Sequence, residues 1–188
     1  MGGLSTVTAD IEQLVRERLQ RQIANGLDDA ALDGAGSGAN PQGIENATGI
    51  ETFATASGNT MTHAESLNAL AEVAENDYHT SNGVWLVHPA NAATLGAQAK
   101  YSGSGQFVCQ DGLISGRRVI ETTHAALHTA YFGFFENVMI GTFGGVDIVV
   151  DPCTNGAKGI VNIYAYQLCE LGVLRPNAFQ KVTLTCKE

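Results

Sequence analysis

The residue pattern with the clearest chemical meaning is a glycine-rich segment near the start of the chain. Gly34-Ala35-Gly36-Ser37-Gly38-Ala39 matches the G-x-G-x-x-A pattern that holds a dinucleotide pyrophosphate. That chemistry needs a strand before the glycines and a helix after them, because the helix N-terminus receives the phosphate. Here a helical pattern comes first and Asn40-Pro41 follows. Because no Gly-Lys-Ser/Thr follows either, the segment predicts a shaped loop rather than a nucleotide site.

Histidines and cysteines are the next candidates, for metal binding. His124 and His128 have the spacing of a zinc-binding helix, but the glutamate of H-E-x-x-H is missing. They lie between strand-like segments, so we predict ordinary loop or strand-end histidines. The four cysteines form no C-x-x-C pair, which argues against a zinc site and a secreted disulfide framework. Free, mostly buried thiols are expected at Cys109, Cys153, Cys169 and Cys186.

Nucleophilic and acid–base catalysis have no recognisable signature. Ser37 and Ser104 lie outside any G-x-S-x-G pattern, and no local motif surrounds a cysteine. The acid pair Asp28-Asp29 is typical of a solvated helix end. We therefore predict no catalytic, cofactor-binding or metal-binding residue, and a protein that is not an enzyme.

Charge is distributed unevenly along the chain. The net charge is −9, and no Lys or Arg lies between Arg21 and Lys100. An acidic middle would repel a phosphate backbone, which argues against sequence-specific nucleic-acid binding. The longest apolar runs are too short to span a bilayer, and no leader pattern opens the chain, so we expect a soluble protein made in the cytoplasm, without membrane contact. The acids of this middle part are Asp28, Asp29, Asp33, Glu45, Glu51, Glu65, Glu72, Glu75 and Asp77.

Helical periodicity dominates the first half of the chain. Apolar residues recur at three- and four-residue spacing over 8–32, which predicts a long helix. A loop follows over 34–44, because its glycines and Pro41 cannot continue a helix. Thr62-His63-Ala64-Glu65 is a capping box that opens a second helix, whose predicted inward residues are Leu67, Leu70, Ala71, Val73 and Ala74. Pro89 opens a short third helix at its favoured first position.

Strand composition dominates the second half. Strands are predicted over 50–54, 83–88, 107–109, 117–122, 130–142, 146–150, 160–169 and 179–185. Turns or loops are predicted at 101–105, 112–116, 144–145, 152–156, Gly172 and 175–176. This order of elements predicts an α+β or α/β fold with one main sheet covered by helices.

Taken in order, four segments resemble the major capsid protein family of tailed bacteriophages, the Hong Kong 97-type coat fold. The helix ending in Leu27-Asp28-Asp29-Ala30-Ala31-Leu32 resembles the spine helix, and 34–44 resembles the glycine-rich loop that leaves it. Val84 to Pro89 with the Ala-rich helix after it resembles the family's strand–Asn-Pro–helix unit, with His88 in place of Asn. Gly172 to Phe179 resembles the strand that returns beside the spine helix.

The resemblance implies an α+β shell subunit of a phage or prophage head. Residues 1–48 and 171–188 would belong to a peripheral lobe, and 49–170 would form an axial lobe. Gly34, Gly36, Gly38, Pro41 and Gly43 would shape a hinge-like joint between them. Axial subunit contacts would involve Tyr101, Ser102, Gly103, Pro152 and Asn155.

The implied function is self-assembly. The full-length protein would form pentamers and hexamers, meet other head proteins and enclose packaged DNA, in the host cytoplasm during assembly and in the virion capsid afterwards. The resemblance covers the C-terminal half of a typical member, without the N-terminal arm and the long E-loop that interlock neighbours. We therefore expect this chain to be a monomer or a small, weak oligomer, and we assign no cross-linking residue.

Two alternatives stay open on the sequence. One is an encapsulin, which shares the fold and encloses enzymes instead of DNA. The other is a small nucleotide- or metal-dependent enzyme that uses Gly34 to Ala39 or the His124/His128 pair.

Overall fold

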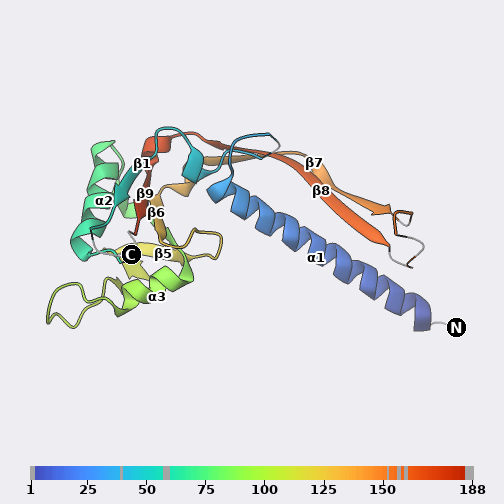
Figure 1. Ribbon diagram of the computed structural model, residues 1–188, viewed down its shortest axis with the longest axis horizontal. Coiled ribbons are helices and arrows are strands. Elements are labelled where there is room, and N and C mark those ends of the chain that lie inside the picture. The colour runs from blue at the N-terminus through green and yellow to red at the C-terminus, as the bar shows by residue number, and fades with distance from the viewer. Residues whose placement is uncertain are drawn as a thin grey trace. The chain divides into compact units, whose positions relative to one another are not determined.

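The computed structural model describes residues 3–38, 40–56, 60–151, 153–155, 158 and 161–184, with side chains from residue 13 onward (Figure 1). Its helices are α1 (Gly3–Asp33), α2 (His63–Glu75) and α3 (Pro89–Ala97). Its strands are β1 (Glu51–Ala54), β2 (Val84–Val87), β3 (Cys109–Gln110), β4 (Leu113–Ile114), β5 (Arg117–Glu121), β6 (Thr129–Gly133), β7 (Val138–Asp151), β8 (Asn162–Val173) and β9 (Phe179–Thr183). The mixture confirms the predicted α+β class.

The chain divides into two compact units. Unit 1 combines Met1–Asp29 with Ile140–Glu170, and unit 2 combines Ala30–Met139 with Leu171–Glu188. The predicted lobe boundaries near residues 48 and 171 concern shell architecture, and they stay a prediction.

Unit 2 is built around a mixed seven-stranded sheet in the order β1-β9-β6-β2-β5-β4-β3. β1 is parallel to β9 and β2 is parallel to β5, while the other pairs are antiparallel. Trp85 of the central strand β2 pairs with Phe132 of β6 and Val119 of β5, and it is fully buried. The predicted strand at 83–88 therefore lies in the middle of the core.

Helix α2 begins at the predicted capping box. The Thr62 hydroxyl accepts the Glu65 amide at 3.2 Å, and the Glu65 carboxylate accepts the Thr62 amide at 2.7 Å. Glu65 also accepts the Ala56 amide at 2.7 Å, which ties the preceding segment to the helix.

The buried face of α2 differs in part from the predicted one. Leu70 and Val73 are buried as expected, whereas Leu67 is 46% exposed and Ala71 and Ala74 are exposed. Ser66 and Ala69 take their places, because the face that contains Leu70 and Val73 passes through positions 66 and 69 at helical spacing.

Two tight turns connect β3, β4 and β5, where a single turn over 112–116 was predicted. Asp111-Gly112 has φ values of 54° and 71°, and Ser115-Gly116 has 50° and 76°. Two successive residues with positive φ define the hairpin turns that match strand twist. The short strand β4 fits between these turns, which is why the single-turn prediction was wrong.

The long strands β7 and β8 correct three further predictions. Gly144-Gly145 and Gly172 were expected to end strands, but they lie inside β7 and β8, which form a two-stranded sheet. The short segment 152–161 joins β7 to β8. The two strands are therefore antiparallel, because a parallel pair needs a longer crossover connection. The predicted strand 130–142 is instead divided between β6 and β7 by a 3-10 turn at Phe135–Asn137.

The buried core belongs to unit 2. Its largest members are Trp85, Tyr131, Phe132 and Phe179. No side chain described for 13–29 or 140–170 is fully buried. Among the described residues, no helix combines the length and apolar character that a bilayer crossing requires.

Candidate assembly surfaces

The glycine-rich loop is a narrow turn closed by backbone hydrogen bonds. The Gly43 amide donates to the Gly34 carbonyl at 2.8 Å, and the Gly36 amide donates to the Pro41 carbonyl at 3.2 Å. A Cβ at Gly34 would lie 2.2 Å from the Pro41 oxygen, and one at Gly43 would lie 2.7 Å from the Leu32 oxygen. These two glycines are therefore required for close approach of backbone to backbone.

The other loop glycines have a different role. Gly36 has φ of 64° and Gly38 has φ of 66°, the left-handed region that side chains with a Cβ rarely adopt. The Gly34 amide donates to the Ala30 carbonyl at 3.0 Å, so the last helical hydrogen bond of α1 is made by the first residue of the loop. No helix follows to receive an anion, because only a 3-10 turn comes next, at Ile44–Asn46.

A polar cluster ties the end of this loop to the sheet. Glu45 accepts the Tyr131 hydroxyl at 2.7 Å and the Lys181 ammonium at 2.5 Å, which brings β6 and β9 together with the loop. Partial burial alone raises the pKa of Glu45, but the hydrogen bonds from Lys181 and Tyr131 outweigh it, and the net pKa is lowered. Burial and the bond to Glu45 raise the pKa of Tyr131.

The first predicted contact loop, 101–105, is exposed throughout. Tyr101 is 61% exposed and its ring meets His63 edge-on, with centroids 5.7 Å apart. The Ser104 hydroxyl accepts the Gln106 amide at 3.3 Å, and the Ser104 amide donates to the Tyr101 carbonyl at 3.1 Å. The loop is thus braced by its own hydrogen bonds, and Tyr101 is its one large side chain; its role in a subunit contact stays a prediction.

A chain of hydroxyls holds the histidine that supports Tyr101. Ser66 donates to the His63 carbonyl at 2.7 Å, the Ser66 and Ser115 hydroxyls are 2.6 Å apart, and Ser115 lies 3.2 Å from His63 Nδ1. Two hydroxyl protons cannot supply three hydrogen bonds. The Ser66 hydroxyl donates to the His63 carbonyl, so Ser115 must donate to Ser66. The third hydrogen bond then needs a proton on His63 Nδ1, which donates to the Ser115 hydroxyl oxygen.

The second predicted contact loop falls in unit 1. Pro152 lies outside the described residues. Asn155 lies 3.5 Å from Asn162, and its carbonyl accepts the Lys158 amide at 2.9 Å. Hydrogen bonds from the Thr154 hydroxyl and from the Cys153 and Thr154 amides lower the pKa of Asp151. The two predicted contact loops therefore belong to different compact units, and a shared axial contact stays a prediction.

The residues considered for metal or nucleophilic chemistry are scattered. His124 and His128 lie in the turns between β5 and β6, as predicted. No group of metal-binding side chains occurs among the described residues. Cys109 is half-buried and its pKa is raised by burial and by Glu121, whereas Cys153 is exposed, contrary to prediction. Cys186 lies outside the described residues.

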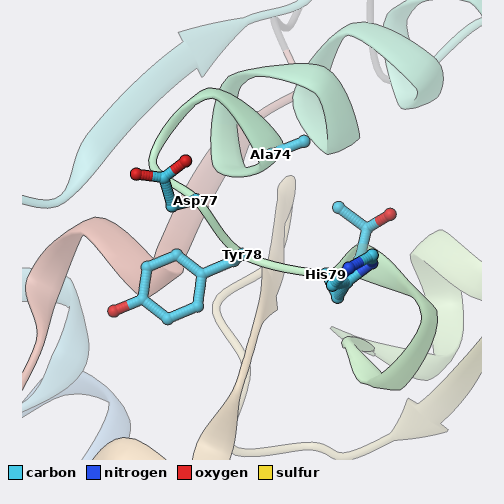
Figure 2. A pocket seen from close by; sticks show the side chains of 5 residues that line it. Ala74, Asp77, Tyr78 and His79 are labelled. Carbon is cyan, nitrogen blue, oxygen red and sulfur yellow. The ribbon is translucent and has the colours of Figure 1, made fainter.

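A shallow depression lies at the end of α2, along the chain segment that leads toward β2 (Figure 2). Its volume is about 340 Å³, and Ala74, Asp77, Tyr78, His79 and Thr80 line it. Tyr78 stacks on Phe134 with ring centroids 5.3 Å apart, so its ring belongs to the packing of unit 2. The depression holds no convergent set of catalytic groups.

The exposed apolar side chains of the β7–β8 sheet were missed by sequence reasoning. Apolar side chains are exposed along both strands of the β7–β8 sheet, although the strand composition itself was recognised. The sequence feature that indicates such a surface is a long strand with large apolar residues on both of its faces. The exposed apolar residues are Met139, Ile140, Phe143, Val149 and Val150 of β7, Val161 just before β8, and Ile163, Tyr164, Tyr166 and Leu168 of β8.

Comparison with known proteins defines the class to which this fold belongs. The capsid of an empty GTA particle has the same fold, with a TM-score of 0.72 at 16% identity, over 94% of this chain and 67% of that chain. The holo-SrpI encapsulin complex of Synechococcus elongatus gives a TM-score of 0.60 at 18% identity, over 92% and 66%. Both likenesses confirm the predicted Hong Kong 97-type coat fold.

Sequence comparison then identifies the family. The phage capsid family model matches residues 4–184, so this chain belongs to the phage capsid family. The chain is also 29% identical over 172 residues to a major capsid protein of Halomonas phage phiHAP-1. That alignment covers 90% of this chain and 28% of the phage protein, so the chain spans less than a third of that relative's length.

Proposed function

We propose that this chain is the shell-forming part of a major capsid protein and builds an icosahedral phage or prophage head around packaged DNA. The observation that carries the proposal is the family match over residues 4–184. The many exposed apolar side chains of the β7–β8 sheet support it, since exposed apolar surface is typical of association sites. We infer a structural rather than a catalytic role, because the family is one of capsid proteins.

The proposed partners follow from this role. Other copies of the chain would form pentamers and hexamers, with 1–48 and 171–188 in the peripheral lobe and 49–170 in the axial lobe. Other head proteins would bind the assembled shell, and assembly would take place in the host cytoplasm. The acidic middle argues against sequence-specific DNA contacts, because it repels phosphate.

An encapsulin-type shell is the second candidate. The fold likeness to the holo-SrpI encapsulin favours it at a TM-score of 0.60, lower than the 0.72 for the GTA capsid. The two functions differ in what the shell encloses.

The experiment is to sediment particles from cells that carry the gene and to treat them with nuclease. Mass spectrometry should find peptides of this chain in particles whose DNA is nuclease-resistant. Protein-filled particles without DNA would establish the encapsulin function instead. If the expressed chain is absent from every sedimenting particle, both shell functions are excluded.

A further inference from the structure

One face of β8 is apolar and open. Tyr164, Tyr166 and Leu168 are 44%, 53% and 73% exposed, and Glu170 continues the same face. Alternate residues of a strand share a face, so these four side chains form one row. On the opposite face, Ile163 is 39% exposed, and the three next residues of that face are half-buried, namely Ala165, Gln167 and Cys169. The Tyr166 face of β8 therefore exposes three large apolar side chains that nothing in the described part of unit 1 covers.

The same compact unit carries a complementary row on α1. Leu14, Arg18 and Arg21 are spaced as i, i+4 and i+7, so they lie on one helix face. Leu14 is 52% exposed, and both arginines are exposed. Glu17 beside them accepts a hydrogen bond from Gln13 at 3.1 Å. This row offers one apolar group and two guanidinium groups.

We propose that the row on β8 binds the row on α1 of a second copy of this chain. Glu170 meets Arg21, Leu168 lies on the aliphatic stem of Arg18, and Tyr166 packs on Leu14. The inference rests on the proposed function, for which it names the partner surface.

The two rows match in charge, chemistry and spacing. Arginine pairs with a carboxylate through a planar fork, and its stem covers apolar surface. The four residue steps from Tyr166 to Glu170 advance about 13 Å along the strand, and the seven steps from Leu14 to Arg21 advance about 10 Å along the helix. An arginine side chain is long enough to bridge the difference.

The two rows differ from each other, so the contact is heterologous. Each copy presents its β8 row to one neighbour and its α1 row to another. Such contacts repeat around a ring when the rotation per copy closes. The contact would thus supply the head-to-tail link that a shell subunit needs.

The test is charge exchange between copies. Sedimentation velocity over a concentration series measures the self-association of the whole chain. We expect Glu170→Arg and Arg21→Glu each to weaken association about tenfold, because each creates a like-charge pair. An equimolar mixture of the two variants should recover wild-type association, since opposite charges then meet in both mixed contacts. Glu136→Arg, an exposed change in unit 2, is the matched control and should leave association unchanged.

Several outcomes would overturn the proposal. One is a mixture that associates no better than either variant alone, and another is a wild-type chain that stays monomeric at about 0.5 mM. Leu168→Ser tests the apolar part separately, and unchanged association of that variant also contradicts the contact. Circular dichroism verifies that each variant folds. If the chain occurs in DNA-containing particles but charge exchange fails, the capsid function stands and this contact is wrong.

Discussion

At the scale of single residues, Glu45 joins three parts of unit 2. Its carboxylate is held by Tyr131 of β6 and Lys181 of β9, residues far away in the sequence. The lowered pKa means that the folded state favours the ionised carboxylate more than the unfolded state does. The stabilisation is therefore complete above the unfolded pKa of about 4.3, and it is lost as pH falls through the folded pKa.

We expect Glu45→Gln to lower the free energy of unfolding by about 1 kcal/mol at pH 7, because this cluster is only partly buried. The variant should also lose less stability than the wild type between about pH 5 and pH 3. Urea unfolding followed by Trp85, the single tryptophan, reports on unit 2. The control Glu136→Gln should stay within about 0.5 kcal/mol of the wild type. Parallel pH profiles for wild type and Glu45→Gln would show that the cluster contributes nothing.

At the scale of elements, the loop after α1 is defined by backbone packing. Gly34 and Gly43 approach each other across the base of the loop, with the Gly43 amide bonded to the Gly34 carbonyl at 2.8 Å. Gly38 lies at the tip in open space, with φ of 66°. The glycines of one loop are thus required for two different physical reasons, close packing at its base and backbone angle at its tip.

The two reasons predict different costs. Gly34→Ala places a methyl group against backbone oxygens that cannot move aside, so we expect a loss of about 3 kcal/mol. Gly38→Ala meets only the penalty of the left-handed conformation, about 1 kcal/mol. Urea unfolding followed by Trp85 measures both. Equal losses would mean that close packing at the base of the loop is unimportant.

At the scale of the whole molecule, the two compact units differ in how they are stabilised. Unit 2 has a core around Trp85, Phe132 and Phe179. Unit 1 has no fully buried side chain among those described for 13–29 and 140–170. Hydrophobic burial is the main favourable term in folding, so we expect unit 1 by itself to be less stable than unit 2.

Hydrogen exchange on the dilute chain should reveal this difference. We expect amides of β6 and β9 to be protected at least about 100-fold more than amides of α1 between residues 13 and 29. Mass spectrometry of peptic fragments resolves the two regions. Equal protection in α1 and β6 would contradict the view that unit 1 is weakly stabilised by itself.

Local features of the sequence were sufficient for most elements. The helix periodicity before residue 33, the capping box at Thr62 and Glu65, and Pro89 at a helix start each depend on neighbours within a few residues. The errors at Gly144, Gly172 and Leu113 arose where strand pairing overrode local turn propensity, because a glycine between two paired segments need not end a strand. Likewise, Leu67 was placed in the core on helical periodicity alone, whereas the packing of α2 left it exposed.

Composition, local periodicity and the order of motifs were enough to predict the α+β class, the acidic middle of the chain and the resemblance to phage capsid proteins. The contact of Glu45 with Lys181, the close approach of Gly34 to Pro41 and the exposure of Leu168 on β8 became known from the folded chain. They depend on burial and strand pairing, which join residues distant in the sequence. A strand's composition predicts that it is extended, but only its neighbours decide which face is covered.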